Sequence, residues 1–181
     1  MEPEVGQNNH QEELGELHTA SFSWAMTCCR GDATAAEDAL QATYVKVLTG
    51  GARFGGRSTF KTWLFAVIRN TAREQARKRL KRSLLLGRWF ESNPVVESTE
   101  AHQREDLESG RTRALVQRAL ERLSEKQRHV LELVFYHDLT LEEAAGVLDM
   151  KLGTARTHYA RGKKQMLKHL EAQPDFEWEP T

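Results

Sequence analysis

Cysteine is scarce in this sequence, and long apolar runs are missing from it. The 181 residues contain two cysteines, Cys28 and Cys29; adjacent cysteines are poorly placed for a structural disulfide and lack the spacing of a zinc site. No apolar run approaches the ~18 residues of a membrane span. The N-terminus, MEPEVGQNNHQEEL, is acidic and lacks the basic-then-apolar order of a signal peptide. These absences predict a reduced, cytoplasmic protein with no membrane insertion; a redox switch at the cysteine pair stays open.

Motifs of catalysis are missing as well. The sequence has no phosphate-binding glycine motif, no cluster of metal ligands and no nucleophile with a suitably spaced base. We therefore expect a protein that is not an enzyme, with no catalytic residues, no metal and no cofactor. An alternating strand pattern and internal repeats are also absent, so the expected fold class is all-α.

What the sequence does have is strongly segregated charge. Its 26 basic and 26 acidic residues balance over the whole chain. Residues 53–88, however, hold eleven Lys or Arg and one acid, Glu74; residues 91–110 hold six acids and one Arg; and residues 151–168 hold six bases and no acid. Two basic stretches around an acidic one indicate a polyanionic partner.

Helical periodicity dominates the N-terminal half. The apolar residues from Phe60 to Ala72 recur at i, i+3, i+4, i+7 and i+8, which predicts a helix with one buried face, capped by Ser58 or Thr59. The core side of this helix is predicted from Phe60, Trp63, Leu64, Val67 and Ile68. A second helix is predicted over 38–48, with Leu40, Tyr44, Val45 and Leu48 on one face. Between the two helices, GGARFGGRS reads as a loop.

Capping signals mark the helices of the C-terminal half. Ser124 to Gln127 and Thr140 to Glu143 are capping-box patterns, each opening a helix. The second helix is short, breaks near Asp149, and is followed by a longer basic helix ending near Leu170. This order predicts a helix-turn-helix, whose second helix enters the DNA major groove.

The expected architecture is thus two small helical domains joined by an acidic linker. The boundaries that we predict are 1–90 for the first domain, 91–110 for the linker, 111–172 for the second domain with the helix-turn-helix, and 173–181 for an acidic aromatic tail.

Three motifs together carry a resemblance to a known family. They are AAEDALQATYVKVL at 35–48, STFKTWLFAVIRNTAREQARKR at 58–79 and LTLEEAAGVLDMKLGTARTHYARGKKQM at 139–166. In order and spacing they resemble the extracytoplasmic-function (ECF) sigma factors, the promoter-recognition subunits of bacterial RNA polymerase. The resemblance implies that the chain binds core RNA polymerase, directs it to specific promoters and helps to melt them.

The resemblance also implies roles for individual residues. Glu37, Asp38 and Gln41 share a helical face and correspond to the face that docks on the clamp helices of the largest polymerase subunit; a merely solvated face is the alternative. Further implied partners are the flap of the second polymerase subunit, promoter DNA and an anti-sigma factor.

For DNA, the resemblance implies two sites. The first takes the minus-ten element as an unpaired strand, and its candidates are Trp63, Arg69, Asn70, Arg73 and Arg77. We expect the three arginines to line an outer stripe beside Asn70, the loop 53–59 to close over an extruded base, and Trp63 to be mainly structural.

The second site takes the minus-thirty-five element as duplex, and its candidates are Thr154, Arg156, Thr157, His158, Arg161 and Lys164. Arg156, Thr157 and Arg161 are expected on the exposed side of the recognition helix as base readers, and Thr154 and Lys164 as phosphate contacts. His158 and Ala155 depart from the family pattern, so the promoter sequence does not transfer.

Two other readings stay open. A stand-alone helix-turn-helix regulator would explain the C-terminal half alone, and a protein-interaction module such as a sigma antagonist would have incidental basic faces. For the tail, the sequence leaves open a disordered end, or a segment that folds back on a basic surface of this chain or of polymerase.

Overall fold

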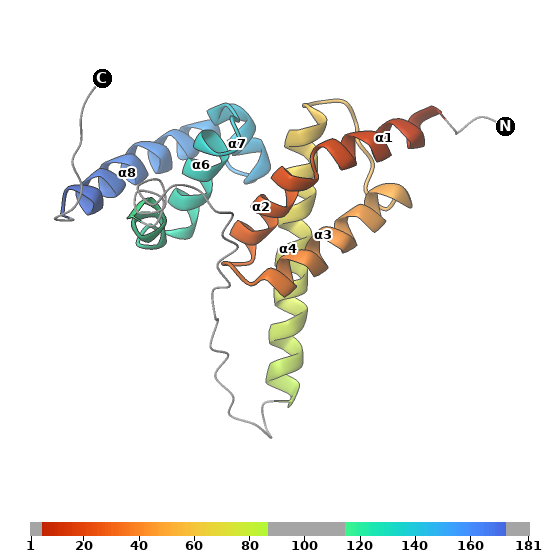
Figure 1. Ribbon diagram of the computed structural model, residues 1–181, viewed down its shortest axis with the longest axis horizontal. Helices are drawn as coiled ribbons and strands as arrows, with labels where there is room; N and C mark the ends of the chain where they lie inside the picture. Colours follow the sequence, from red (N-terminus) through yellow and green to blue (C-terminus); the bar gives the residue numbers. More distant parts are fainter. Residues whose placement is uncertain (1–4, 87–114, 173–181) are drawn as a thin grey trace, which may run out of the picture. The chain divides into compact units, whose positions relative to one another are not determined.

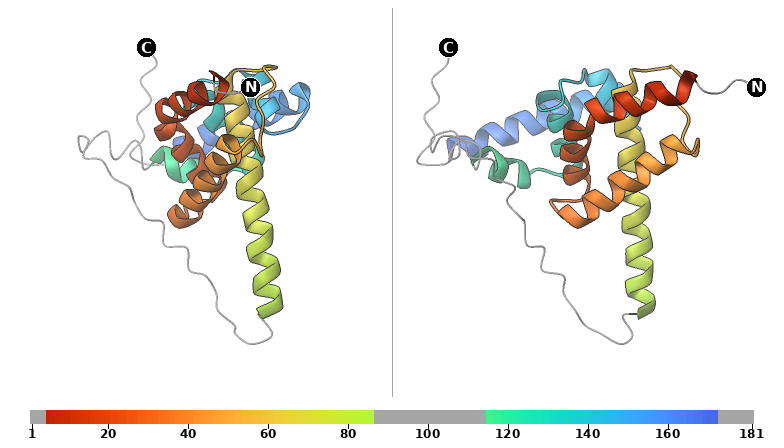
Figure 2. Two further views of the ribbon diagram at one scale, coloured as in Figure 1. Left: turned by 90° about the vertical axis from the view of Figure 1, so that its right-hand side faces the viewer. Right: turned by 45° about the vertical axis from the view of Figure 1, so that its right-hand side comes forward.

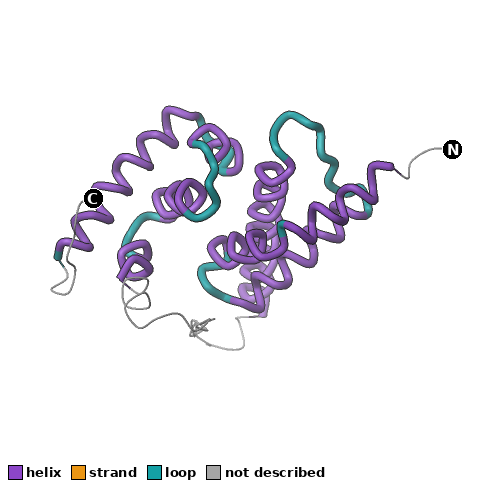
Figure 3. Tube along the Cα trace, turned by 45° about the horizontal axis from the view of Figure 1, so that its top comes forward, coloured by secondary structure: helices purple, strands orange, loops and turns teal. Residues whose placement is uncertain are grey.

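The computed structural model describes residues 5–86 and 115–172, with side chains from residue 10 to 84 in the first range. Every regular element in these ranges is a helix (Figure 3). The chain divides into two compact units, Met1–Glu100 and Ala101–Thr181. The all-helical, two-unit prediction is confirmed, whereas the predicted linker and tail lie outside the described residues.

Within the described residues, the first unit contains four helices: α1 (Val5–Glu16), α2 (His18–Cys28), α3 (Ala33–Leu48) and α4 (Phe60–Leu86). α2, α3 and α4 pack on one another, and the last turns of α4 extend beyond the other three helices (Figures 1 and 2). The N-cap of α3 is Asp32, whose Oδ1 accepts from the backbone N–H of Ala35 at 2.9 Å. Thr59 caps α4, since its Oγ1 accepts from the N–H of Thr62 at 3.2 Å.

The core of this unit is built around Trp24 and the first half of α4. The Trp24 ring is fully buried and stacks on Phe65, with centroids 5.9 Å apart. Its indole N–H donates to the carbonyl oxygen of Phe65 at 3.0 Å, so the buried donor is satisfied. Leu64 and Ile68 are fully buried beside it. This packing fixes which face of α4 is left for other contacts.

The second unit contains a short helix over residues 115–121, then α6 (Glu125–Phe135), α7 (Leu141–Val147) and α8 (Leu152–Glu171). Both predicted capping boxes are present, Ser124 with Gln127 at α6 and Thr140 with Glu143 at α7. Between α7 and α8, Asp149 adopts a left-handed conformation with φ of 51°, which Asp tolerates better than most residues. The helix-turn-helix prediction is confirmed.

Candidate nucleic-acid and polymerase interfaces

The recognition helix α8 presents one charged side to solvent. Ala155 and Gly162 are buried against the unit, whereas the opposite side is exposed. The exposed side carries the predicted residues Thr154, Arg156, Thr157, Arg161 and Lys164. The Thr157 hydroxyl donates to the carbonyl of Gly153 at 2.9 Å, which leaves its oxygen to accept from a partner.

His158 lies at the edge of this face rather than on it. Its side chain is partly buried, and burial lowers its pKa below 6.5, with further lowering by the nearby cations Lys126 and Arg161. These effects favour the neutral form of the ring in the free protein.

Gly162 allows α8 to approach α6 closely, a feature that the sequence pattern did not reveal. A Cβ at this position would lie 3.1 Å from Leu131 Cδ1 and 3.3 Å from Gln127 Cβ. A Cβ at this position would require Leu131 or Gln127 to shift by a few tenths of an ångström. Gly162 thus permits close packing of the recognition helix on α6.

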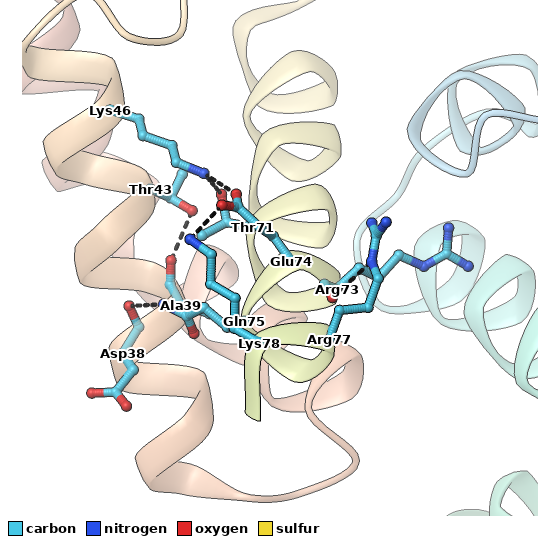
Figure 4. Close-up of polar contacts among 10 residues, drawn as sticks. All are labelled: Asp38, Ala39, Thr43, Lys46, Thr71, Arg73, Glu74, Gln75, Arg77 and Lys78. Carbon is cyan, nitrogen blue, oxygen red and sulfur yellow. Dashed lines mark hydrogen bonds and ion pairs between the residues drawn. The ribbon is translucent and has the colours of Figure 1, made fainter. Parts of the chain in front are cut away.

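The outer face of α4 carries three of the five residues predicted for the single strand. Asn70, Arg73 and Arg77 are exposed at i, i+3 and i+7, so they form one stripe along the helix. Arg77 Nε donates to the carbonyl of Arg73 at 3.3 Å, which draws the two arginines together (Figure 4).

The prediction that Arg69 belongs to this outer stripe is wrong. Its residue surface is only 4% exposed, because the buried stripe of α4 runs through Phe65, Ile68, Arg69 and Ala72. The apolar pattern had suggested Trp63 and Val67 as core residues, but both are only partly buried. The predicted face was therefore rotated by part of a turn.

Trp63 belongs to an aromatic cluster at the start of α4. Its ring lies 5.3 Å from that of Phe60 and 5.4 Å from that of Phe54 in the preceding loop. His10 of α1 stacks on Phe60 at 5.1 Å. The cluster holds one side of the loop, while Arg53 and residues 55–59 remain exposed. Trp63 thus packs in an aromatic cluster at the edge of the unit rather than in its core.

The acidic face of α3 is exposed as predicted, and it continues into apolar residues. Glu37, Asp38 and Gln41 are exposed. One and two turns further, Val45 is 60% and Leu48 is 43% exposed. The prediction that these two share a helical face with Leu40 is wrong: Leu40 is buried, whereas the spacing from Gln41 to Val45 and Leu48 follows the outer stripe. A stripe that is polar at one end and apolar at the other suits a protein partner.

Glu74 joins the helix that carries this face to the helix that carries the cationic stripe. Its carboxylate accepts from Lys46 of α3 at 2.9 Å and from Lys78 of α4 at 2.7 Å (Figure 4). One residue on, Gln75 Nε2 donates to the backbone oxygen of Asp38 at 3.1 Å. The single acid of the basic segment is therefore an inter-helix contact.

This contact predicts a pH dependence of stability. The hydrogen bond from Lys78, then that from Lys46, lowers the pKa of Glu74 from 4.5 to about 2. A carboxyl group with a depressed pKa in the folded state stabilises it above the unfolded value, and this stabilisation is lost as the pH falls from 4.5 toward 2. The thermal midpoint of the wild type should exceed that of Glu74→Gln above pH 4.5, with the difference closing by pH 2; a constant difference would contradict this.

Comparison with known proteins places these surfaces in a family. Residues 16–82 match the model of Sigma-70 region 2, and residues 113–166 match that of Sigma-70, region 4. The chain is 30% identical over 141 residues to the ECF RNA polymerase sigma factor SigX of Bacillus subtilis, covering 77% of this chain and 73% of SigX. This chain belongs to the ECF sigma factors.

Other relatives agree with this assignment. The RNA polymerase sigma-H factor of Pseudomonas aeruginosa is 27% identical over 146 residues, covering 77% of this chain and 75% of its own. Among solved structures, the sigma factor RpoE in complex with the anti-sigma factor NepR from Bartonella quintana has the same fold. Its TM-score is 0.67 at 24% identity, and the match covers 91% of this chain and 98% of RpoE.

The function of this ECF sigma factor is to direct RNA polymerase to promoters. The region 2 match contains every residue predicted for the polymerase and the single strand, and the region 4 match contains the whole exposed side of α8 up to Lys164. α1 lies almost entirely before the first match. No helix within the described ranges could span a membrane, and no cluster of metal ligands occurs there.

Neither cysteine of the sigma factor forms a disulfide, and both side chains are partly buried. Burial raises the pKa of Cys29 to about 11, with Asp32 and Asp38 adding to the increase against the opposing charge of Arg79. Its thiol is therefore neutral at pH 7, and a neutral thiol reacts slowly with oxidants or disulfides.

Proposed function

We propose that three separate faces of this sigma factor perform promoter recognition. The exposed side of α8 reads the minus-thirty-five element as duplex, the Asn70/Arg73/Arg77 stripe holds the minus-ten element as an unpaired strand, and the outer face of α3 docks on the clamp helices of the largest polymerase subunit. One observation supports this proposal most directly. The residues predicted for each of the three contacts, apart from Arg69, Trp63 and His158, are exposed on one side of a helix whose other side is buried in the core.

The chemistry of each face supports its assignment. Exposed Arg156 and Arg161 on a helix after a tight turn can donate in pairs to guanine in the major groove. On α4, arginines for phosphates and an exposed amide for base edges meet the needs of an unpaired strand. On α3, the carboxylates of Glu37 and Asp38 would repel DNA, so that face suits a protein.

The proposal extends to the remaining partners and boundaries. We propose contact of the second unit with the flap of the second polymerase subunit, domains at 1–90 and 111–172 around a linker at 91–110, and a cytoplasmic protein that acts without catalysis. We also propose an anti-sigma partner, since the fold is shared with RpoE in complex with the anti-sigma factor NepR and with CnrH in complex with the cytosolic domain of CnrY.

Transcription in a purified system tests the whole proposal. Core bacterial polymerase with this chain should produce run-off transcripts from a subset of genomic fragments that core polymerase alone does not transcribe. Duplex binding without transcription would indicate a stand-alone helix-turn-helix regulator. Failure to bind both DNA and core polymerase would indicate an interaction module.

The polymerase face has a test of its own. Asp38→Ala and Gln41→Ala should each weaken binding to core polymerase by about 1 kcal/mol, because exposed polar contacts at an interface are usually worth that or less when truncated. Val45→Ala should weaken it through lost apolar contact. Thr19→Ala, which is exposed on α2 and lies outside this face, serves as the control. Unchanged affinity of all three variants by competition binding would remove this face from the proposal.

A further inference from the structure

A group of aromatic residues interrupts the charged surface of the second unit. Phe135 and Tyr136, at the end of α6, are 56% and 54% exposed. The Phe135 ring stacks on Tyr159 of α8 with centroids 5.9 Å apart, and Lys163 Nζ lies 5.3 Å from the centroid of Tyr159. We call these four residues the aromatic patch. Large half-exposed rings next to one another, with a cation at their edge, mark a contact surface.

The aromatic patch borders the proposed DNA-reading side of α8. Lys163 follows Arg156 by seven residues, which is close to two helical turns, so the two lie on the same strip of the helix. Tyr159 lies between that strip and the buried side, which is marked by Ala155 and Gly162. A segment covering the patch would therefore also cover the Arg156 edge of the reading side.

We propose that the chain's own C-terminal segment, QPDFEWEPT (173–181), occupies the aromatic patch and competes there with DNA. This goes beyond promoter recognition itself, because it assigns a surface of the free sigma factor to its own tail. The segment combines three acids and no base with two large rings, Phe176 and Trp178. Its composition is complementary to a patch of exposed rings and a lysine on a helix that is otherwise basic.

The length of the segment matches the distance that it must cover. Lys163 and Tyr159 precede Ala172 by nine and thirteen residues, or about 14 and 20 Å along α8 at 1.5 Å per residue. Phe176 and Trp178 follow Ala172 by four and six residues, so a fully extended backbone carries them at most about 14 and 20 Å. Reversing the chain takes about two of these residues, so Trp178 reaches the level of Lys163, at the near end of the aromatic patch.

Acidic and aromatic residues alternate in the segment, and this alternation suits a strip of α8 with the aromatic patch on one side and the DNA-reading side on the other. Neighbouring side chains of an extended segment point in opposite directions. If Phe176 and Trp178 turn toward Phe135 and Tyr159, then Asp175, Glu177 and Glu179 turn toward the edge of the reading side that carries Arg156. The acids would then occupy positions where phosphates bind in the DNA complex.

A truncated chain that ends at Ala172 tests the competition. With a fluorescein-labelled, mixed-sequence DNA duplex, the truncated protein should bind roughly threefold to tenfold more tightly than the full chain at low salt, with the difference shrinking as salt screens the charges. The double variant Phe176→Ala/Trp178→Ala keeps every tail charge and should show most of the same gain. Wild-type affinity of that variant would mean that the acids merely repel DNA, and would overturn docking on the patch.

The patch side of the contact is tested by a double-mutant cycle. Phe135→Ala should tighten duplex binding in the full chain but not in the truncated chain, whereas Gln165→Ala, exposed on α8 outside the patch, should not tighten it in either. Should Phe135→Ala lower the melting temperature markedly, Tyr136→Ser replaces it. Equal effects in both chains would overturn the proposal.

A crosslinking measurement uses the free protein without DNA. It therefore tests the docking of the tail even if α8 does not read DNA as proposed. With the photoreactive p-benzoylphenylalanine in place of Trp178, irradiation of the free protein should give crosslinks to Phe135, Tyr136 or Tyr159 within one chain. Crosslinks only to residues of the first unit, or none, would overturn the proposal. So would a truncation that reduces transcription but leaves DNA binding of the free protein unchanged, because that result assigns the tail to polymerase.

Discussion

Replacing both Arg156 and Arg161 with alanine should lower the affinity of the polymerase complex for an upstream promoter duplex by roughly 2 to 6 kcal/mol. Each arginine is exposed on the side of α8 opposite Ala155 and Gly162, and removing one base-reading arginine typically costs about 1 to 3 kcal/mol. The two positions are five residues apart and, on the proposed assignment, would contact different bases, so their effects should roughly add. Fluorescence anisotropy with a duplex identified by run-off transcription measures the loss.

Two comparisons separate base reading from general attraction. Lys164→Ala removes a proposed phosphate contact, so it should weaken all duplexes alike and reduce the salt slope by about one. The arginine variants should instead lose selectivity among minus-thirty-five variants, while binding of core polymerase persists. Unchanged selectivity in both single variants would remove Arg156 and Arg161 from the list of readers.

The elements that the sequence predicts best are those set by local chemistry. Both capping boxes could be identified because Ser124/Gln127 and Thr140/Glu143 satisfy the first backbone N–H groups of a helix through contacts only three residues apart. The break at Asp149 depends on one residue that tolerates a positive φ. Such features need no knowledge of the rest of the fold, and they were sufficient to place the recognition helix.

Which side of a helix is buried is harder to predict when apolar residues occur all around the helix. On α4, Trp63 and Val67 suggested a core face that the structure places elsewhere, with Phe65 fully buried and Trp63 packed against a loop. The burial of Arg69 has the same cause, because the true buried face of α4 is rotated relative to the predicted one. A long arginine stem can pack along apolar surface, so the residue type alone does not exclude burial.

Apolar residues at an interface resemble core residues in a sequence. Val45 and Leu48 were placed on the face of Leu40 because their apolar side chains alone do not distinguish a buried position from an exposed one. The role of Gly162 could not be predicted either, because it depends on Leu131 and Gln127, which lie on another helix. The exposure of Val45 and Leu48 and the role of Gly162 are therefore visible only in the tertiary structure.

Asn70→Ala should slow promoter opening on linear duplex by about tenfold to a hundredfold, because an amide that contacts a base edge is worth on the order of 1–3 kcal/mol. Asn70 is exposed at the N-terminal end of the stripe that continues through Arg73 and Arg77. This stripe lies on the side of α4 opposite the buried Ile68. A base edge can be contacted there only after it leaves the stack, so the contact contributes to opening and not to duplex docking. Permanganate reactivity of thymines near the start site measures the opening directly.

The discriminating substrate is a template whose minus-ten region is already unpaired. On that template no free energy is needed to unstack the bases, but the variant still lacks the contact of the Asn70 side chain with a base. Asn70→Ala should therefore still bind the unpaired strand more weakly than the wild type. Arg77→Ala should weaken it too, and that loss should fall with rising salt because it concerns phosphates; the Asn70 loss should not. Normal opening by Asn70→Ala on linear duplex would assign Asn70 to the solvated surface and leave strand capture to the arginines alone.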